Sequence, residues 1–421
     1  MTAWQPGSWR EHQPDSSKAL ALRQALDLLS TRPPIVLARE ALRLRSALAE
    51  VAAGNAFLLQ ASDCAQVMSD WRVEVIREKL RRLLQLALVL TYGTGLPVVK
   101  VARIGDYLAD ARSRSTETPG LAEARHRWAP DPAQLLAAYD RSVSAINAVR
   151  ALAAEGSASP YQPGGWNLDF LMNSNCRADL ETATEITKAI RFMAALGISP
   201  SGGNLGGHAQ FWVAHEARQL SWEQALTRHD STTGEWWDSS AHLLWLGERS
   251  RRPDGTRVEF LRGILNPVEA KLGPAATPEA VVRLCEALNP QRRPGRLILV
   301  CRMGARDVAK KLPPILAAVR DSGHVVVWAC DPIHANTFAR RDGRTERSFA
   351  DVVGEVRGYF NAHKLAGTWP GGLYVELASS QVPAYCEAAV PQQGDADHAG
   401  MIGASESFGV AFQLVDILRR Y

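Results

Sequence analysis

The sequence predicts an α/β fold: a (β/α)8 TIM barrel with an N-terminal helical extension and a long helical insertion between its second and third strands. Three patterns carry this prediction. Eight short apolar segments have the composition of strands that are buried on both faces. Amphipathic helical patterns follow several of them, as in parallel β/α units. Polar residues stand at or just beyond the end of every segment, where barrels of this kind place their active sites.

The composition is that of a folded globular protein. Apolar residues make up 46% and charged residues 22% of the 421 residues, which allows a sizeable core. The net charge of +4 is small and no basic run is interleaved with aromatic residues, so we expect no nucleic-acid partner. The polar N-terminus lacks a secretory signal, and the apolar stretch at 83–90 is too short to span a membrane. Six scattered cysteines suit reduced thiols, so we expect a cytoplasmic protein without a membrane partner.

Two amphipathic patterns open the chain, at 16–30 and 36–54, and Gly54 is a suitable residue to end the second. We interpret residues 1–54 as a helical extension and residues 55–421 as the barrel. The eight predicted strands of the barrel are 57–60 (FLLQ), 97–103 (PVVKVAR), 210–215 (QFWVAH), 242–247 (HLLWLG), 267–272 (PVEAKL), 297–302 (LILVCR), 324–330 (HVVVWAC) and 372–377 (GLYVEL).

Helical patterns follow the fifth, sixth and seventh strands, at 278–289, 305–323 and 348–364. The insertion covers about 104–206 and is mostly helical in pattern. Together these segments give the alternation of strand and helix that a parallel barrel requires.

Every predicted strand ends on or near a polar residue. Alone, each has an ordinary explanation: a buried cysteine, a loop histidine, a paired glutamate or a surface arginine. Polar residues at all eight ends are harder to explain in that way, and a barrel would bring them to one mouth. They are Cys64, Arg103, His215 with Glu216, Glu248 with Arg249, Lys271, Arg302, His334 and Glu376.

Three of these residues form a potential metal-binding set. Cys64, His334 and Glu376 combine a soft, a borderline and a hard ligand, which suits manganese, cobalt, iron or zinc. With an open coordination position, such an ion can polarise a substrate oxygen. Pro332 ends the seventh strand, so His334 lies just beyond the strand end.

Four cations form the second set: Arg103, Arg249, Lys271 and Arg302. Burying them without anions would cost roughly several kcal/mol each, so they imply an anionic ligand. A small substrate that carries phosphate or carboxylate groups fits this set.

Seven stretches of the chain match the motifs of one enzyme family, in the family's order and over about residues 40–380. They are AFLLQASDCAQ, PVVKVARI, VAHEARQLSWEQALTR, HLLWLGERSRRPDGTRVEFLRGILNPVEAKLGP, PGRLILVCRMGARDVAKKLPP, VVVWACDPIHANT and GTWPGGLYVEL. In these stretches the chain resembles the class II (plant-type) 3-deoxy-D-arabino-heptulosonate 7-phosphate (DAHP) synthases. These enzymes open the shikimate pathway of aromatic amino acid biosynthesis.

The resemblance implies a metal-dependent barrel that condenses phosphoenolpyruvate with the aldehyde of erythrose 4-phosphate and releases phosphate. It implies a divalent cation, manganese or cobalt before zinc or iron, held by Cys64, His334 and Glu376. It also implies a homo-oligomer that contacts its partners through the N-terminal helices. The residues that it places around phosphoenolpyruvate are Arg103, Arg112, Ser113, Glu248, Arg249, Lys271 and Arg302, of which Lys271, Arg302 and Glu248 would be catalytic.

The chain departs from the family pattern in three places. Asp110 and Ala111 replace a lysine and a proline of a Lys-Pro-Arg-Ser motif whose Arg112 and Ser113 remain. A tyrosine-arginine-glycine-aspartate stretch that closes over the sugar phosphate is absent. The segment that supplies the fourth metal ligand lacks its aspartate, and Asp397 or His398 is the candidate replacement.

These departures suggest a divergent enzyme that keeps the phosphoenolpyruvate half of the site and accepts a different aldehyde, in secondary metabolism. One alternative is an ordinary DAHP synthase that uses erythrose 4-phosphate. A second is a catalytically inactive binding or regulatory protein. An unrelated metal-dependent barrel lyase or hydrolase is disfavoured, because simple hydrolysis does not need four cations beside a metal.

Overall fold

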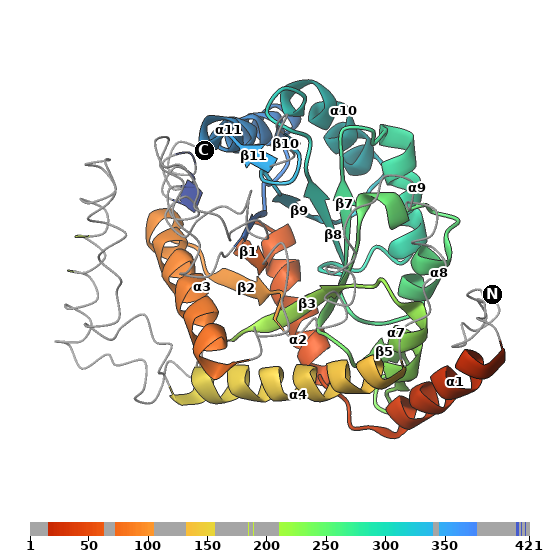
Figure 1. Cartoon of the computed structure of the whole chain (residues 1–421). Helices are drawn as coiled ribbons and strands as arrows, with labels where there is room; N and C mark the ends of the chain where they lie inside the picture. Colours follow the sequence, from red (N-terminus) through yellow and green to blue (C-terminus); the bar gives the residue numbers. More distant parts are fainter. Residues whose placement is uncertain are drawn as a thin grey trace.

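A closed barrel of eight parallel strands forms the centre of the molecule (Figure 1). The computed structural model describes residues 16–62, 72–104, 132–155, 184, 188, 210–339, 345–376, 410, 411, 414 and 417. The order around the barrel is β1-β12-β9-β8-β7-β6-β3-β2. The TIM-barrel prediction is confirmed, and each barrel strand lies on a predicted segment. The strands are β1 (Phe57–Ser62), β2 (Val98–Ala102), β3 (Trp212–Glu216), β6 (Leu243–Leu246), β7 (Val268–Leu272), β8 (Leu297–Cys301), β9 (Val327–Cys330) and β12 (Gly372–Glu376).

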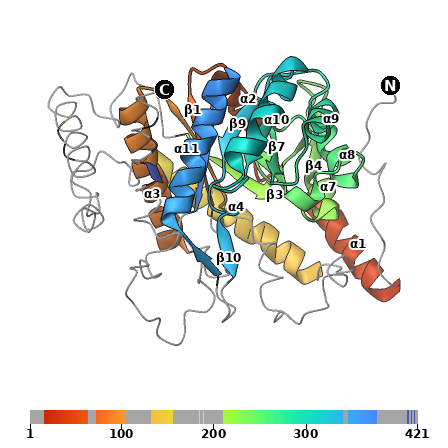
Figure 2. The ribbon, with the colours of Figure 1, turned by 90° about the horizontal axis from the view of Figure 1, so that it is seen from above.

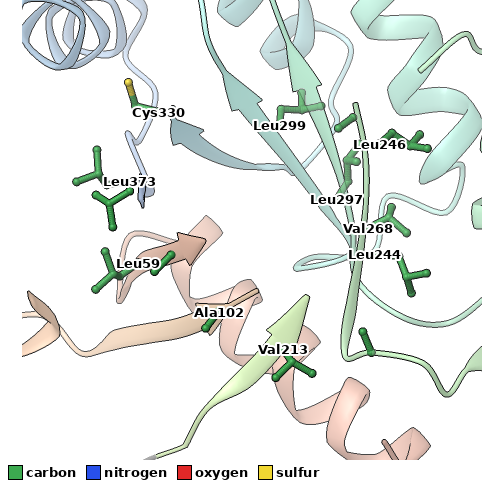
Figure 3. Close-up of a cluster of buried hydrophobic side chains, with 14 of the residues drawn as sticks. Leu59, Ala102, Val213, Leu244, Leu246, Val268, Leu297, Leu299, Cys330 and Leu373 are labelled. Carbon is green, nitrogen blue, oxygen red and sulfur yellow. The ribbon is translucent and has the colours of Figure 1, made fainter. Parts of the chain in front are cut away.

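Side chains alternate along each strand between two apolar layers. One layer fills the barrel and includes Leu58, Val101 and Ile298. The other lies between strands and helices and includes Leu59, Val268 and Leu299 (Figure 3). Because both faces of each strand are buried, the strands are continuous apolar segments in the sequence.

Helix α2 closes the N-terminal end of the barrel. Its apolar residues Leu44, Leu48 and Val51 are fully buried and belong to the same cluster as Leu58 and Val327 inside the barrel. This helix (Ala38–Ala52) ends before Gly54, whose φ of 85° is accessible to glycine at little cost. The apolar face of α2 is therefore part of the barrel core.

The helices that follow the barrel strands surround them (Figure 1). Thr277 caps one of them by accepting a hydrogen bond from the Ala280 amide, and Ser348 caps another by accepting one from Asp351. The helices that follow barrel strands are α3 (Val73–Thr94), α7 (Leu220–Leu226), α8 (Thr256–Arg262), α9 (Pro278–Leu288), α10 (Val308–Asp321) and α11 (Phe349–Ala366).

Two further helices pack together beside the barrel. Helix α4 (Pro132–Glu155), between β2 and β3, contacts α1 (Ser16–Thr31) and α3 (Figure 2). The Tyr139 hydroxyl donates a hydrogen bond to the Pro33 carbonyl at 2.7 Å, and Arg150 pairs with Glu40 of α2 at 2.9 Å. These contacts fix α4 on the segment that precedes the barrel.

Two small hairpins are absent from the sequence prediction. The first joins β4 (Thr227–His229) to β5 (Trp236–Asp238). The second joins β10 (Thr337–Ala339) to β11 (Thr345–Arg347) and projects from the barrel in Figure 2. Among the described helices, none combines the length and the apolar character needed to cross a membrane.

Candidate active site

The predicted site residues divide into those that the structure describes and those that lie outside the described residues. The residues outside the described part of the chain are Cys64, Arg112, Ser113, Asp397 and His398, together with Asp110 and Ala111. The others lie at the carboxyl ends of the barrel strands, and they are Arg103, Glu248, Arg249, Lys271, Arg302, His334 and Glu376.

Strand alternation directs several of these side chains into the mouth. Tyr374 belongs to the interior cluster, and Glu376 follows it by two residues on β12. In the same way Arg302 follows Val300, and Arg103 follows Val101. Because residues two apart share a face of a strand, these polar side chains continue the interior face at its open end.

Asp331, directly after β9, is fully buried and contacts two of the predicted site residues. Its carboxylate accepts hydrogen bonds from the backbone amides of Ile333 and His334, both at 3.2 Å. It also contacts Nδ1 of His334 at 2.8 Å and Nζ of Lys271 at 3.1 Å. Burial raises the pKa of Asp331, but His334 and Lys271 outweigh it and hold the pKa well below its usual range.

The His334 ring is oriented for a metal or a proton on its other nitrogen. Asp331 accepts from Nδ1, which leaves Nε2 to carry either a proton or a metal ion, and Nε2 lies 3.3 Å from Oε1 of Glu376. An unprotonated Nε2 and a carboxylate oxygen this close repel each other unless a proton or a metal ion lies between them. The fully buried Glu376 and the imidazole, once Nε2 is unprotonated, are therefore suitable ligands for a divalent cation, and the predicted third ligand Cys64 lies outside the described residues.

Lys271 is held as a cation between a carboxylate and two aromatic rings. Its ammonium lies 3.9 Å from the centre of the Tyr374 ring and 4.9 Å from that of Trp245. Burial lowers the pKa of Lys271, but Asp331, Tyr374 and Glu269 raise it above its usual value overall. These neighbours therefore favour the protonated form of Lys271.

Two arginines also lie at this mouth. Arg103 is buried, and its guanidinium lies 5.8 Å from the centre of the Trp245 ring. Arg302 donates a hydrogen bond to the His334 carbonyl at 3.1 Å and lies 3.9 Å from a carboxylate oxygen of Glu248. The mouth thus combines three cations, of which Lys271 and Arg302 lie near the carboxylates of Asp331 and Glu248.

Glu248 occupies its place only because residue 273 is glycine. A Cβ atom at Gly273 would lie 2.0 Å from Oε1 of Glu248. Gly273 directly follows β7, two residues after Lys271, so the bare backbone at the strand end leaves room for the carboxylate of the neighbouring strand.

Two strand-end residues do not join the cluster. The Arg249 side chain is exposed in the 3-10 turn Glu248–Ser250. His215 lies on the outer face of β3, where Nε2 contacts Glu223 of α7 at 3.1 Å and Ser240 at 3.2 Å. The polar end of β3 that shares the interior face is Glu216, since Ala214 belongs to the interior cluster.

Sequence reasoning missed Asp331, Trp245 and Tyr374 as site residues. Asp331 stands in the polar run after the seventh strand, but an aspartate before a proline is common in loops. The two aromatic residues lie within apolar strands, where nothing in the composition separates an interior position from an exterior one. Their signal was their spacing: each lies two residues from a polar residue or glycine at the same strand end.

A buried acid lies one layer below the site. Glu269 on β7 is fully buried beside Gln60, and neither of its oxygens accepts a hydrogen bond of normal geometry. Burial raises its pKa to about 7, against the attraction of Lys271 and the contact with Gln60. The acid therefore titrates near neutral pH within the barrel.

Known proteins resemble the chain over nearly its whole length. A family model described as the class-II DAHP synthetase family matches residues 4–397. The phospho-2-dehydro-3-deoxyheptonate aldolase of Streptomyces coelicolor is 41% identical over 394 residues, which cover 89% of this chain and 87% of the relative. The corresponding protein AroG of Mycolicibacterium smegmatis is 39% identical over 442 residues, which cover 99% and 93%.

A solved structure supports the fold alone. The phospho-2-dehydro-3-deoxyheptonate aldolase of Francisella tularensis SCHU S4 matches 94% of this chain and 96% of its own, with a TM-score of 0.51 and 9% identity. The family model and the two relatives establish a closer relationship. The chain therefore belongs to the class-II DAHP synthetase family.

Proposed function

We propose that the chain condenses phosphoenolpyruvate with an aldehyde in a metal-dependent reaction that releases phosphate. The observation that carries this proposal is the mouth of the barrel, where Lys271, Arg103 and Arg302 lie beside the His334–Glu376 pair. Family membership supplies the reaction class. The cations suit an anionic donor, and the adjacent acceptor pair suits a divalent cation.

Lys271, Arg103 and Arg302 would bind the phosphate and carboxylate groups of phosphoenolpyruvate. Lys271 keeps its proton, so it donates hydrogen bonds and offsets negative charge throughout the reaction. The two strand-borne cations, Arg103 and Lys271, lie at fixed separations from the Trp245 ring, which limits the orientations of the bound enol.

The bond changes are those of the family's reaction class. The enol carbon of phosphoenolpyruvate attacks the carbonyl carbon of the aldehyde, and the aldehyde oxygen takes up a proton. Water adds at C2 and gives up a proton, which balances the proton that the aldehyde oxygen takes up. Phosphate then leaves with the C2–O bond electrons of the tetrahedral intermediate, and the remaining C2 hydroxyl loses its proton as the ketone forms. The cations that bind the donor offset the charge that develops on the leaving phosphate.

Cys64, His334 and Glu376 would hold the divalent cation, manganese or cobalt, with Asp397 or His398 as a further ligand. When bound, the cation supplies Lewis acidity toward the aldehyde oxygen. Asp331 keeps Nε2 of His334 directed at Glu376, so the protein orients this ligand before the cation arrives.

We further propose that the acceptor is an aldehyde other than erythrose 4-phosphate, used in secondary metabolism. Asp110 in place of the lysine would repel an acceptor phosphate and suit a hydroxylated or cationic group. The competing function is that of an ordinary DAHP synthase, as the relatives' name phospho-2-dehydro-3-deoxyheptonate aldolase implies. The 41% and 39% identities over most of the chain favour this alternative.

The test measures phosphate release from phosphoenolpyruvate with Mn²⁺ or Co²⁺ and a panel of aldehydes that includes erythrose 4-phosphate, amino sugars and non-phosphorylated sugars. We expect the highest kcat/KM with an aldehyde that lacks the phosphate. A highest value with erythrose 4-phosphate would establish the ordinary function. No release with any aldehyde would overturn the proposal in both forms.

A further inference from the structure

The loop after β8 carries Arg302, and the loop after β9 carries His334. Hydrogen bonds join the two loops directly. Arg302 donates to the His334 carbonyl at 3.1 Å. The Ala305 amide donates to Oδ1 of Asn336 at 3.0 Å. A predicted donor-binding residue and a predicted metal ligand therefore share one two-loop unit, defined here as residues 302–305 and 332–336.

A carboxylate outside the mouth holds both loops of this unit. Glu355 of α11 is fully buried, and its Oε1 accepts hydrogen bonds from the backbone amides of Met303 at 2.6 Å and Gly304 at 2.8 Å. Its Oε2 accepts from Nδ2 of Asn336 at 2.7 Å. One side chain thus satisfies a donor from each loop, and leaving any of them unpaired in the interior would be costly.

Asn336 cannot adjust to a change at Glu355. Its Nδ2 also donates to the Pro332 carbonyl at 2.7 Å, while its Oδ1 is occupied by the Ala305 amide. Reversing the amide would break both contacts. The backbone at Gly304, with φ of 83°, turns away from β8 at this point and presents its amide to Glu355.

We propose that Glu355 is a positioning residue that sets the location of Arg302 relative to His334, and so couples donor binding to metal binding. The proposal rests on the proposed function for the roles of those two residues. Glu355 itself stays on the far side of the loops and acts through Met303, Gly304 and Asn336.

Glu355→Gln is the sharpest probe of this role. Burial raises the pKa of Glu355 to about 8, against its three donors, so both protonation states must be considered. In either state Oε2 keeps a lone pair for Asn336, whereas the amide nitrogen of glutamine has none. The variant therefore places two donors face to face, and turning the amide over directs its NH2 group at the two backbone amides instead.

The double variant Glu355→Gln with Asn336→Asp reverses the polarity of this contact. The glutamine NH2 group can donate to the new carboxylate, which can still accept from the Ala305 amide. Only the contact with the Pro332 carbonyl is lost. The double variant should therefore recover part of what the single variant loses.

His363→Asn serves as the matched control. His363 is also fully buried on α11, and its Nδ1 contacts the Thr368 hydroxyl at 2.8 Å. It packs against Trp328 and Tyr359, away from the two-loop unit. This variant should lower the Tm without moving either loop.

We expect Glu355→Gln to raise the KM for phosphoenolpyruvate and the Kd for Mn²⁺ each by about tenfold. The double variant should bring both values back toward wild type, and His363→Asn should leave both within about twofold. A Tm loss in Glu355→Gln with unchanged KM and Kd, or the same KM and Kd changes in His363→Asn, would overturn the proposal. If Glu355→Gln does not fold, Glu355→Asp, which is one methylene shorter, takes its place.

Amide hydrogen exchange separates this proposal from the proposed function, because it needs no ligand. Glu355→Gln should raise exchange in residues 302–305 and 332–336 together, and His363→Asn in neither. If the wild-type protein shows no phosphoenolpyruvate turnover, the proposed function fails, and the Mn²⁺ Kd and the exchange data still decide the positioning role. Exchange that rises in one loop alone would refute the coupling.

Discussion

At the scale of single residues, Asp331 links and orients two of the site residues, Lys271 and His334. Its carboxylate contacts Lys271 and His334 at once, and it also accepts the backbone amides that shape the loop. A site built from the strand-end residues alone would lack the group that orients these two. Sequence analysis predicted the strand-end residues but could not assign this role to Asp331, because side-chain contacts across strands leave no pattern along the chain.

Asp331→Asn should weaken metal binding by about 10- to 100-fold. An asparagine can accept from Nδ1 of His334 or donate to it, so the tautomer that directs the Nε2 lone pair at Glu376 is no longer enforced. Calorimetric titration with Mn²⁺ measures the effect. Unchanged affinity would mean that Asp331 does not orient the ligand.

Glu269 should make stability fall as the pH rises. Burial raises its pKa from 4.5 to about 7, so the folded protein binds this proton more tightly than the unfolded chain. The contribution to stability is complete below pH 4.5 and is lost as the pH rises to about 7; it amounts to roughly 3 kcal/mol.

Glu269→Gln removes this titrating group while keeping its shape. We expect the free energy of unfolding of the variant to decline less between pH 5 and pH 8 than that of the wild type, as urea denaturation at each pH would show. Parallel pH profiles for the two proteins would contradict the account of Glu269.

At the scale of elements, the alternation of side chains along each strand decides which strand-end residues face the mouth of the barrel. Sequence analysis predicted where all eight strands lie, because strands buried on both faces are continuous apolar runs. The same continuity hides which residues face inward, so His215 was grouped with the mouth although it contacts Glu223 on the outside. The β4–β5 and β10–β11 hairpins have three-residue strands, which are too short to show a period.

Gly273→Ala tests the packing at the end of β7. The new Cβ would lie 2.0 Å from the present position of Glu248, whose flexible carboxylate must move away from Arg302. We expect a lower kcat/KM for phosphoenolpyruvate with little change in Tm. In a Glu248→Ala background the same substitution should have no further effect, and an equal additional loss there would show that Glu248 is not the residue affected.

Leu48→Ala tests the closure of the barrel by α2. Leu48 is fully buried and packs in the barrel interior, so its truncation should cost about 2–5 kcal/mol in the free energy of unfolding. Chemical denaturation measures the loss. A value below about 1 kcal/mol would mean that α2 does not form part of the barrel core.

At the scale of the whole molecule, the two ends of the barrel differ: one is packed with apolar side chains, and the other carries the charged residues of the candidate site. Helix α2 fills the N-terminal end with apolar side chains, and the carboxyl ends of the strands collect the charged ones. Residues as distant in sequence as Arg103 and Glu376 therefore share one mouth. This convergence was predictable from the number of strands, whereas the contacts of Asp331, Glu269 and Glu355 depend on side-chain packing that one sequence does not display.

The most direct test of the account compares phosphate release from phosphoenolpyruvate by the wild type and by Lys271→Met. The assay uses the aldehyde panel with Mn²⁺, and again after removal of metal by a chelator. We predict aldehyde-dependent release by the wild type that is lost with the metal, and a fall in kcat/KM of about 100-fold or more in Lys271→Met, because a buried fixed charge is removed. Equal release by the two proteins, or release that persists without metal, would contradict the account.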